Sequence, residues 1–165
     1  MRDDSDRTDS VLDDLSSTAT ASDQSGSYGV SVGATDGVRD VEREVDELIE
    51  RVNNVLPAEN VQLDESIIKD NLDEVLLMLI ALHGEAHGKE LLSNLADFFG
   101  VQLSPGTVYP ALHKLEEEDV LSMHAKVRTK EYSIADENLA RATLERAMVQ
   151  HLAFGLLLYS FSPRL

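Results

Sequence analysis

The chain has 165 residues, of which 31 are acidic and 14 are basic, so its formal net charge is −17. A chain of this length favours one compact domain with extensions over two full domains. It has no cysteine, which excludes a disulfide scaffold, a thiolate metal site and a cysteine nucleophile. A surface that is acidic and poor in lysine suits a protein that must stay hydrated in molar salt. We therefore expect a halophilic source, with an ordinary acidic protein as the alternative.

Residues 1–36 are rich in Ser, Thr, Asp and Gly and contain few large apolar side chains. They have no sustained period, so we expect a disordered acidic tail. The tail begins MRDDSDRTDS and has no apolar stretch of the kind that a signal peptide needs. The longest apolar run near the C-terminus, Phe154 to Tyr159, is too short to span a bilayer. The sequence therefore predicts a cytoplasmic protein.

Residues 37–57 are predicted to form an amphipathic helix with a heptad pattern. Apolar residues recur at alternating spacings of 3 and 4, with charged residues between them. Asp36 is a suitable N-cap, and Pro57 would end the helix. The pattern is too short to indicate a coiled coil by itself, so two interpretations stay open. The helix either pairs with its copy in a dimer or packs on its own domain. In the first case the contact residues would be Val41, Val45, Leu48 and Val52.

Residues 66–135 are predicted to form a DNA-binding domain that begins with three helices. Apolar residues at helical spacing predict the first helix over about 67–82 and the second over about 88–99. The third helix is expected over about 104–118, because a serine at its N-cap is followed by Pro105 at the first helical position.

The period of the apolar residues changes from 3.6 towards 2 after the third helix. Alternation over about 121–128 and 131–134 predicts two short antiparallel strands joined near 127–129. Asp136 is a suitable cap for a last helix that reaches about residue 160.

Three helices followed by a β-hairpin form the winged helix-turn-helix arrangement. The expected fold is mainly α with a small β-hairpin, with the heptad helix before the winged domain and one long helix after it. That last helix, within residues 136–165, is strongly apolar for so small a core, so we expect it to pair with another subunit. The residues expected in this contact are Leu144, Met148 and Leu152.

Acidic residues are absent from two windows of this acidic chain, 98–115 and 120–130. Surfaces without carboxylates can approach phosphate. Lys126, Arg128 and Lys130 stand at alternate positions, and a period of two would place them on one face of a strand. A plain solvated strand face is the alternative. Hydroxyl, aromatic and basic side chains along the third helix suit phosphates and base edges. The candidate DNA-binding residues are Ser104, Thr107, Tyr109, His113, Lys114, Lys126, Arg128 and Lys130.

The segment LSPGTVYPALHKLEEEDVL, residues 103–121, resembles the core of the PadR family of winged-helix regulators. The family pattern is Ser-Pro-Gly-Thr, an aliphatic residue, Tyr-Pro-Ala-Leu, two residues and Leu-Glu, and this chain has it over 104–116. His87-Gly88 resembles the family's His-Gly turn. The resemblance covers about residues 70–135, including Lys130 and Tyr132, which resemble the basic residue and the tyrosine of the second wing strand.

The resemblance implies a dimer with each third helix in a major groove and each wing along the DNA backbone. It also implies dimerisation through the C-terminal helix, and that Pro110 is normal inside its helix although proline removes an N–H there. Asp119 departs from the family, because relatives commonly have Gly at this place. An αL backbone would be tolerable for Asp at some cost. The acidic heptad helix is not part of the core family and leaves activation or repression open.

The sequence therefore predicts a sequence-specific transcription regulator that binds double-stranded promoter or operator DNA as a homodimer, without a cofactor. An acidic chain with this domain is also similar to the gas-vesicle gene activators of haloarchaea, which favours an activator. The N-terminal helix could recruit a regulatory protein partner. The alternative is a winged-helix interaction module without DNA binding, which would not need the basic residues of the hairpin.

Enzyme activity is not expected, because the chain has no Gly-rich phosphate loop and no nucleophile elbow. His83, Glu85 and His87 lie close together but lack the His-Glu-two residues-His spacing of zinc proteases. We therefore expect no metal site.

Overall fold

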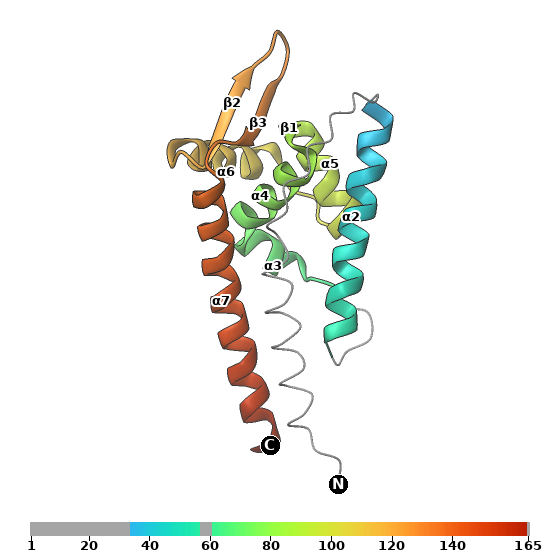
Figure 1. Cartoon of the computed structure of the whole chain (residues 1–165), viewed down its shortest axis with the longest axis vertical. Helices are drawn as coiled ribbons and strands as arrows, with labels where there is room; N and C mark the ends of the chain where they lie inside the picture. Colours follow the sequence, from blue (N-terminus) through green and yellow to red (C-terminus); the bar gives the residue numbers. More distant parts are fainter. Residues whose placement is uncertain (1–33, 57–60, 165) are drawn as a thin grey trace.

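The structure is a computed structural model of the chain and describes residues 34–56 and 61–164. Most of the tail expected over residues 1–36 lies outside the described residues. Figure 1 shows the elements in chain order. They are α2 (Ala34–Val55), α3 (Glu65–Asp70), α4 (Leu72–His83), β1 (Glu85–His87), α5 (Gly88–Phe99), α6 (Pro105–Glu117), β2 (Leu121–Ala125), β3 (Lys130–Ile134), α7 (Glu137–Phe161) and the short 3₁₀ helix η1 (Ser162–Arg164).

The core forms around α4, which contacts α2, α5, α6, α7, β1 and β3. Helices α5 and α6 each carry apolar residues three and four positions apart, and these buried stripes belong to the same core cluster as α4. The β2–β3 hairpin extends from one end of this core, and α7 extends from the other (Figure 1). The central buried side chains are Leu76, Leu79 and Ile80 of α4, Leu91 and Leu95 of α5, Leu112 and Leu115 of α6, and Tyr132 of β3.

The expected winged helix-turn-helix fold is confirmed, with one addition and one interruption. The addition is β1, which pairs antiparallel with β3 to make a three-stranded sheet in the order β1-β3-β2. The sequence predicted no strand between the first two helices. A three-residue strand is too short to show a period, and its pairing partner lies more than forty positions away in the chain.

The interruption divides the first predicted helix at Asn71. The backbone of Asn71 has φ −120° and ψ 34°, which is not helical, so α3 ends before it and α4 starts after it. The Asn71 side-chain amide donates to the carbonyl oxygen of Ile67 at 2.8 Å. Such a bond satisfies the backbone locally and competes with continuation of the helix.

Several expected helix ends are confirmed. Gly84 and Gly100, after α4 and α5, have φ of +76° and +66°, and glycine adopts this backbone without the strain that a side chain adds. The carboxylate of Asp136 accepts hydrogen bonds from the backbone N–H groups of Asn138 and Leu139 at the start of α7. Asp36 is not the N-cap that was expected, because α2 already begins at Ala34.

Helix α2 packs on its own domain over part of its length. Val41 and Val45 are buried, and the helix contacts α4. Leu48 and Val52, the next residues of the heptad pattern, are 38% and 48% exposed. The apolar stripe is therefore only partly covered within the described chain.

Helix α7 touches its own domain mainly through its first turns, where Ala140 is buried. It contacts α4, and His151 Nε2 lies 2.7 Å from the side-chain oxygen of Asn71. Leu144, Met148 and Leu152 are all more than a third exposed. No helix within residues 34–56 and 61–164 combines the length and hydropathy that crossing a bilayer requires.

Candidate nucleic-acid interface

Helix α6 has a buried side and an exposed side. Val108, Leu112 and Leu115 are buried against the core, while Thr107, His113 and Lys114 of the predicted set are exposed. Ser104 stands at the N-cap position as expected, but its hydroxyl does not cap the helix. It lies 3.1 Å from the hydroxyl of Thr107, so the two oxygens form one polar group at the exposed start of α6.

Proline 110 lies inside α6, and the helix continues through it from Pro105 to Glu117. The Pro110 side chain is exposed to solvent. Because proline has no N–H, the carbonyl of Gly106 four residues earlier lacks its usual helical partner. This carbonyl adds an acceptor to the exposed side of α6, which sequence reasoning did not foresee.

Tyr109 is half-buried and packs against the start of α5. A Cβ atom placed on Gly88 would come within 2.6 Å of the Tyr109 ring carbons and hydroxyl oxygen. Only glycine allows this approach. The aromatic ring therefore fixes the spacing of the two helices of the helix-turn-helix, and Tyr109 serves packing in addition to any contact outside the protein.

Lys114 is exposed, but its ammonium group points to α4. The Nζ atom donates to the carboxylate of Asp73 at 2.6 Å, and this bond raises the pKa of Lys114. His113 pairs with Glu116 on the same helix, with 3.3 Å between Nδ1 and Oε2. To bind phosphate, the Lys114 ammonium and the His113 imidazole must each break the contact with its carboxylate or bind both groups at once.

The hairpin does not align its three basic residues as the sequence suggested. Residues 126–129 form the turn between β2 and β3, so the alternation of one strand does not run through them. Lys126 pairs with Glu131, whereas Lys130 is the neighbour of Glu131 in β3 and points to the opposite face. Arg128 lies exposed in the turn. The prediction of one basic face is therefore wrong, because the turn changes the direction of the chain between Lys126 and Lys130.

Glu131 organises the outer face of the sheet at the base of the hairpin. In the register of the sheet it lies between His87 of β1 and His124 of β2. Its carboxylate accepts a hydrogen bond from Lys126, which lowers the pKa of Glu131 and raises the pKa of Lys126. Lys126 is thus held by Glu131 at the start of the hairpin turn, while the ammonium of Lys130 and the guanidinium of Arg128 make no ion pair within residues 34–56 and 61–164.

On the inner face of the sheet, Tyr132 is fully buried. Its hydroxyl has no hydrogen-bond partner among the described residues. Burial disfavours the charged phenolate and raises the pKa of Tyr132, with smaller contributions from Glu116 and Tyr109. Tyr132 therefore acts as a large core residue under α6 and is not available to a ligand.

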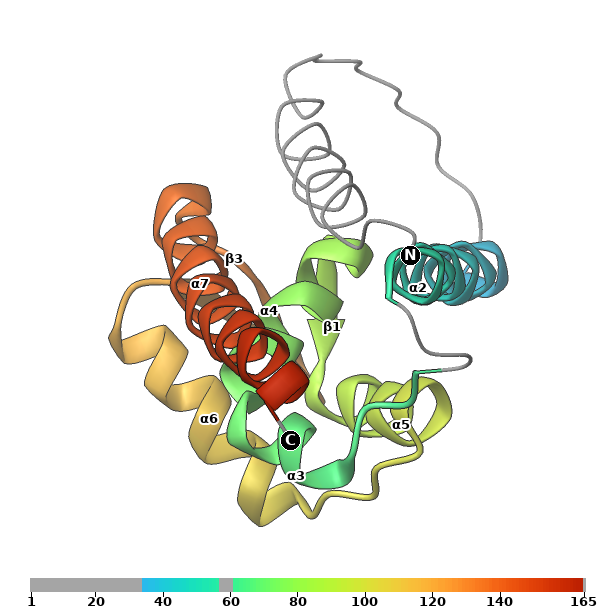
Figure 2. The same cartoon turned by 90° about the horizontal axis from the view of Figure 1, so that it is seen from below.

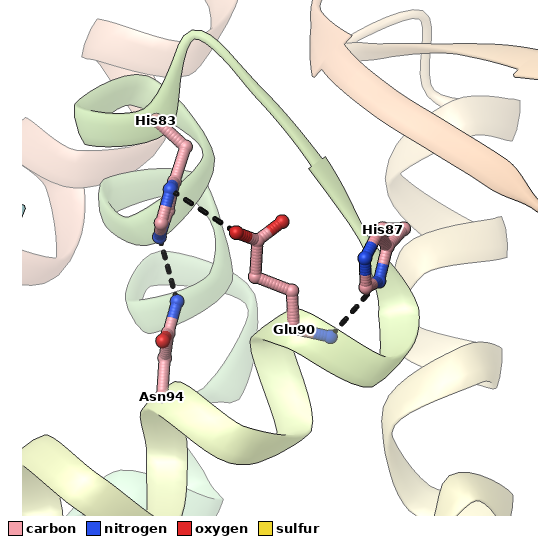
Figure 3. A network of polar contacts seen from close by, with 4 residues as sticks. All are labelled: His83, His87, Glu90 and Asn94. Carbon is pink, nitrogen blue, oxygen red and sulfur yellow. Dashed lines mark hydrogen bonds and ion pairs between the residues drawn. The ribbon is translucent and has the colours of Figure 1, made fainter. Parts of the chain in front are cut away.

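A polar network joins α4 to the start of α5 (Figure 3). The buried side-chain amide of Asn94 lies 2.6 Å from His83 Nε2, and His83 Nδ1 lies 3.6 Å from the carboxylate of Glu90. His87 Nδ1 accepts from the backbone N–H of Glu90 at 3.1 Å and so caps α5. His83 and His87 therefore have structural partners, and their role in orienting the helix-turn-helix was not anticipated from the sequence.

The helix-turn-helix and its wing agree with a known family. Residues 76–138 match the family described as transcriptional regulator PadR-like. This segment of the chain is similar to a PadR-like domain. It extends from within α4 to the start of α7 and includes α5, α6 and the whole sheet. The PadR resemblance noted in the sequence is thereby confirmed.

Relatives of this chain occur in haloarchaea. The chain is 43% identical over 104 residues to the transcriptional activator GvpE of Haloferax mediterranei, which covers 58% of this chain and 54% of that protein. It is 40% identical over 96 residues to the transcriptional activator GvpE1 of Halobacterium salinarum, covering 58% of this chain and 50% of that protein. The chain thus spans about half the length of these relatives. They agree with the expected link to haloarchaeal activators.

A solved structure of a transcriptional regulator from Clostridium thermocellum is also similar. It is 18% identical, with a TM-score of 0.48, and the likeness covers 56% of this chain and 94% of that chain.

Proposed function

We propose that this chain is a sequence-specific DNA-binding transcription regulator that activates transcription in a haloarchaeon. The observation that carries the proposal is that the start of α6 and the tip of the hairpin are both exposed and both lie in stretches of the chain without carboxylates. The hydroxyls of Ser104 and Thr107 lie at this end of α6, and Arg128 and Lys130 lie at the hairpin. Hydroxyl groups and cations are the usual partners of DNA phosphates.

The acidic surface of the chain is compatible with this function because of where it lies. Helix α2 contains seven Asp and Glu residues and three Arg residues, and it lies on the opposite side of the core from α6 (Figure 2). In molar salt the Debye length is only about 3 Å, so these charges would repel DNA little across the domain. Binding would depend on contacts at close range more than on a broad basic surface.

We further propose that the regulator binds as a homodimer, with the exposed face of α7 at the subunit contact. Leu144, Met148 and Leu152 would be buried there. A two-fold dimer would present two copies of α6 to two half-sites about one helical turn apart. The activating role follows from the names of the haloarchaeal relatives, which are transcriptional activators.

The test is capture of DNA fragments in molar KCl. The natural chain is compared with an Arg128→Ser/Lys130→Ser variant. We expect the natural chain to enrich an inverted repeat. The variant should bind this site at least about thirtyfold less tightly, because two lost phosphate contacts in each subunit, on the order of 1 kcal/mol each, remove about 2 kcal/mol.

The control variant carries Arg43→Ser and Lys69→Ser, which remove the same two charges on α2 and α3, away from the hairpin. Its affinity should stay within about twofold of the natural chain, since it changes no proposed phosphate contact. Equal losses in both variants would mean that only net charge matters. No enrichment by a folded, dimeric natural chain would favour the protein-interaction module instead.

A further inference from the structure

The C-terminal half of α7 has apolar side chains on every side and few polar ones, Gln150, His151 and Ser160. From residue 147 to residue 163 the chain has no Asp, Glu, Lys or Arg. Successive residues of a helix point about 100° apart, so Leu156, Leu157 and Leu158 face three different directions. They are 42%, 64% and 54% exposed. A helix that is apolar all round is normally enclosed rather than covered along one stripe.

A single partner helix cannot enclose this segment. Pairing of two α7 helices would cover one face of each and leave the other faces in water. Another apolar surface is therefore needed. Among the described residues outside α7, the exposed large hydrophobic side chains are Leu48, Val52, Leu56, Leu63, Ile67 and Val127.

Five of these six side chains belong to α2, α3 or the segments that follow α2 and precede α3. Val127 is in the hairpin turn, at the end of the molecule opposite to the tip of α7 (Figure 1). The second half of α2 extends away from the hairpin in the same direction as α7 (Figure 1). Its exposed side chains, Leu48 and Val52, continue the stripe in which Val41 and Val45 are already buried.

We propose that the exposed part of this stripe, Leu48 and Val52, receives the C-terminal turns of α7 from a second copy of the chain. The proposal rests on the homodimer of the proposed function and adds α2 to its interface. In a two-fold dimer the contact occurs twice, once for each α7. The α2 helix is rich in carboxylates, and the incoming segment carries none, so no like charges meet.

This arrangement differs from a zipper between two α2 helices. In a zipper Leu48 and Val52 would contact their own copies, and the tip of α7 would keep its exposed faces. In the proposed arrangement each stripe is covered by α7 of the partner. One disulfide cross-linking experiment distinguishes the two arrangements. The natural chain has no cysteine, so every disulfide that forms must come from the introduced cysteines.

The experiment mixes two full-length chains with different tags, one with Val52→Cys and one with Leu157→Cys, and oxidises them in molar KCl. The proposal predicts a disulfide between the two chains as the main product. The control replaces Val52→Cys by Arg43→Cys, which lies nine residues earlier and points to the opposite, solvent side of α2, with a side chain 67% exposed. It should give at least tenfold less of the mixed product.

The remaining outcomes overturn the proposal. A main product between two Val52→Cys chains would indicate an α2 zipper. No mixed product from a chain that sediments as a dimer and still captures its DNA site would reject the α2 contact and leave the proposed function intact. A natural chain that sediments as a monomer would reject both the contact and the homodimer.

Discussion

Asp119 is the residue at which the backbone is least suited to its side chain. Its φ is +58°, and no other described residue except glycine has a positive φ. The turn after α6 requires this geometry. The N–H of Val120 donates to the carbonyl of Leu115 at 3.0 Å, which closes the helix and directs the buried Val120 into the core. Asp adopts the αL region at a moderate cost.

Replacement Asp119→Gly should stabilise the domain by roughly 0.5–1 kcal/mol, because glycine adopts positive φ without a Cβ penalty. Asp119→Ala should destabilise it by a similar amount, since alanine lacks the polar side chain that helps Asp in this region. Chemical denaturation in molar KCl measures both. If the two variants were equally stable, the strain at this position would not depend on φ.

At the scale of elements, the function depends on how α5 is held against α6 and α4. One contact is the approach of Tyr109 to Gly88, and the other is the network of His83, Glu90 and Asn94. Both act at the start of α5. The Tyr109 ring thus sets the spacing of α5 and α6, and the buried imidazole of His83 helps to hold α5 on α4.

Replacement Gly88→Ala should destabilise the domain by about 1–3 kcal/mol, because the new methyl group would overlap the Tyr109 ring and force it to move. It should also weaken DNA binding by displacing α6 relative to α5. The matched control is Gly106→Ala in α6. A Cβ there would lie 3.6 Å from the Ser104 hydroxyl, an ordinary contact.

The control should be as stable as the natural chain or more stable by up to about 1 kcal/mol, because alanine favours a helix over glycine. Thermal unfolding of the two variants in molar KCl distinguishes the effects. Equal stability of Gly88→Ala and the natural chain would mean that Tyr109 does not fix the helix spacing.

At the scale of the whole molecule, the wing and the tip of α7 lie at opposite ends (Figure 1). DNA contact and subunit contact can therefore occupy separate surfaces. A change in α7 should alter the oligomeric state without touching α6 or the hairpin, and should affect DNA affinity only because two linked half-site contacts become one.

Replacement Leu152→Glu should convert the dimer largely to monomer, with dimerisation weakened about a hundredfold or more, because an unpaired charge in an apolar contact costs several kcal/mol. Asn138→Glu introduces the same charge at a polar, exposed position in the first turn of α7, before the apolar segment, and should change dimerisation little. Sedimentation velocity in molar KCl reports both. A dimeric Leu152→Glu chain would remove this residue from the proposed contact.

Features that depend on neighbouring residues could be predicted from the sequence. Apolar residues at spacings of three and four located α5 and α6, and the glycines after α4 and α5 marked helix ends. Asp136 marked the start of α7. The fixed pattern over residues 104–116 indicated the PadR-like domain. All of these signals are local, because helix propensity, capping and turn geometry act within a few residues.

The remaining features come from contacts between residues far apart in the chain. Strand β1 exists because β3 pairs with it, and Lys114 is drawn to Asp73 across 41 positions. Because the hairpin turn lies between them, Lys126 and Lys130 point to opposite faces of the sheet. The sequence by itself determined where most of the helices lie, where several of them end and which family the pattern over residues 104–116 resembles. Only the tertiary structure decided which cations are paired and which apolar surfaces stay exposed, because these depend on the partners that folding brings together.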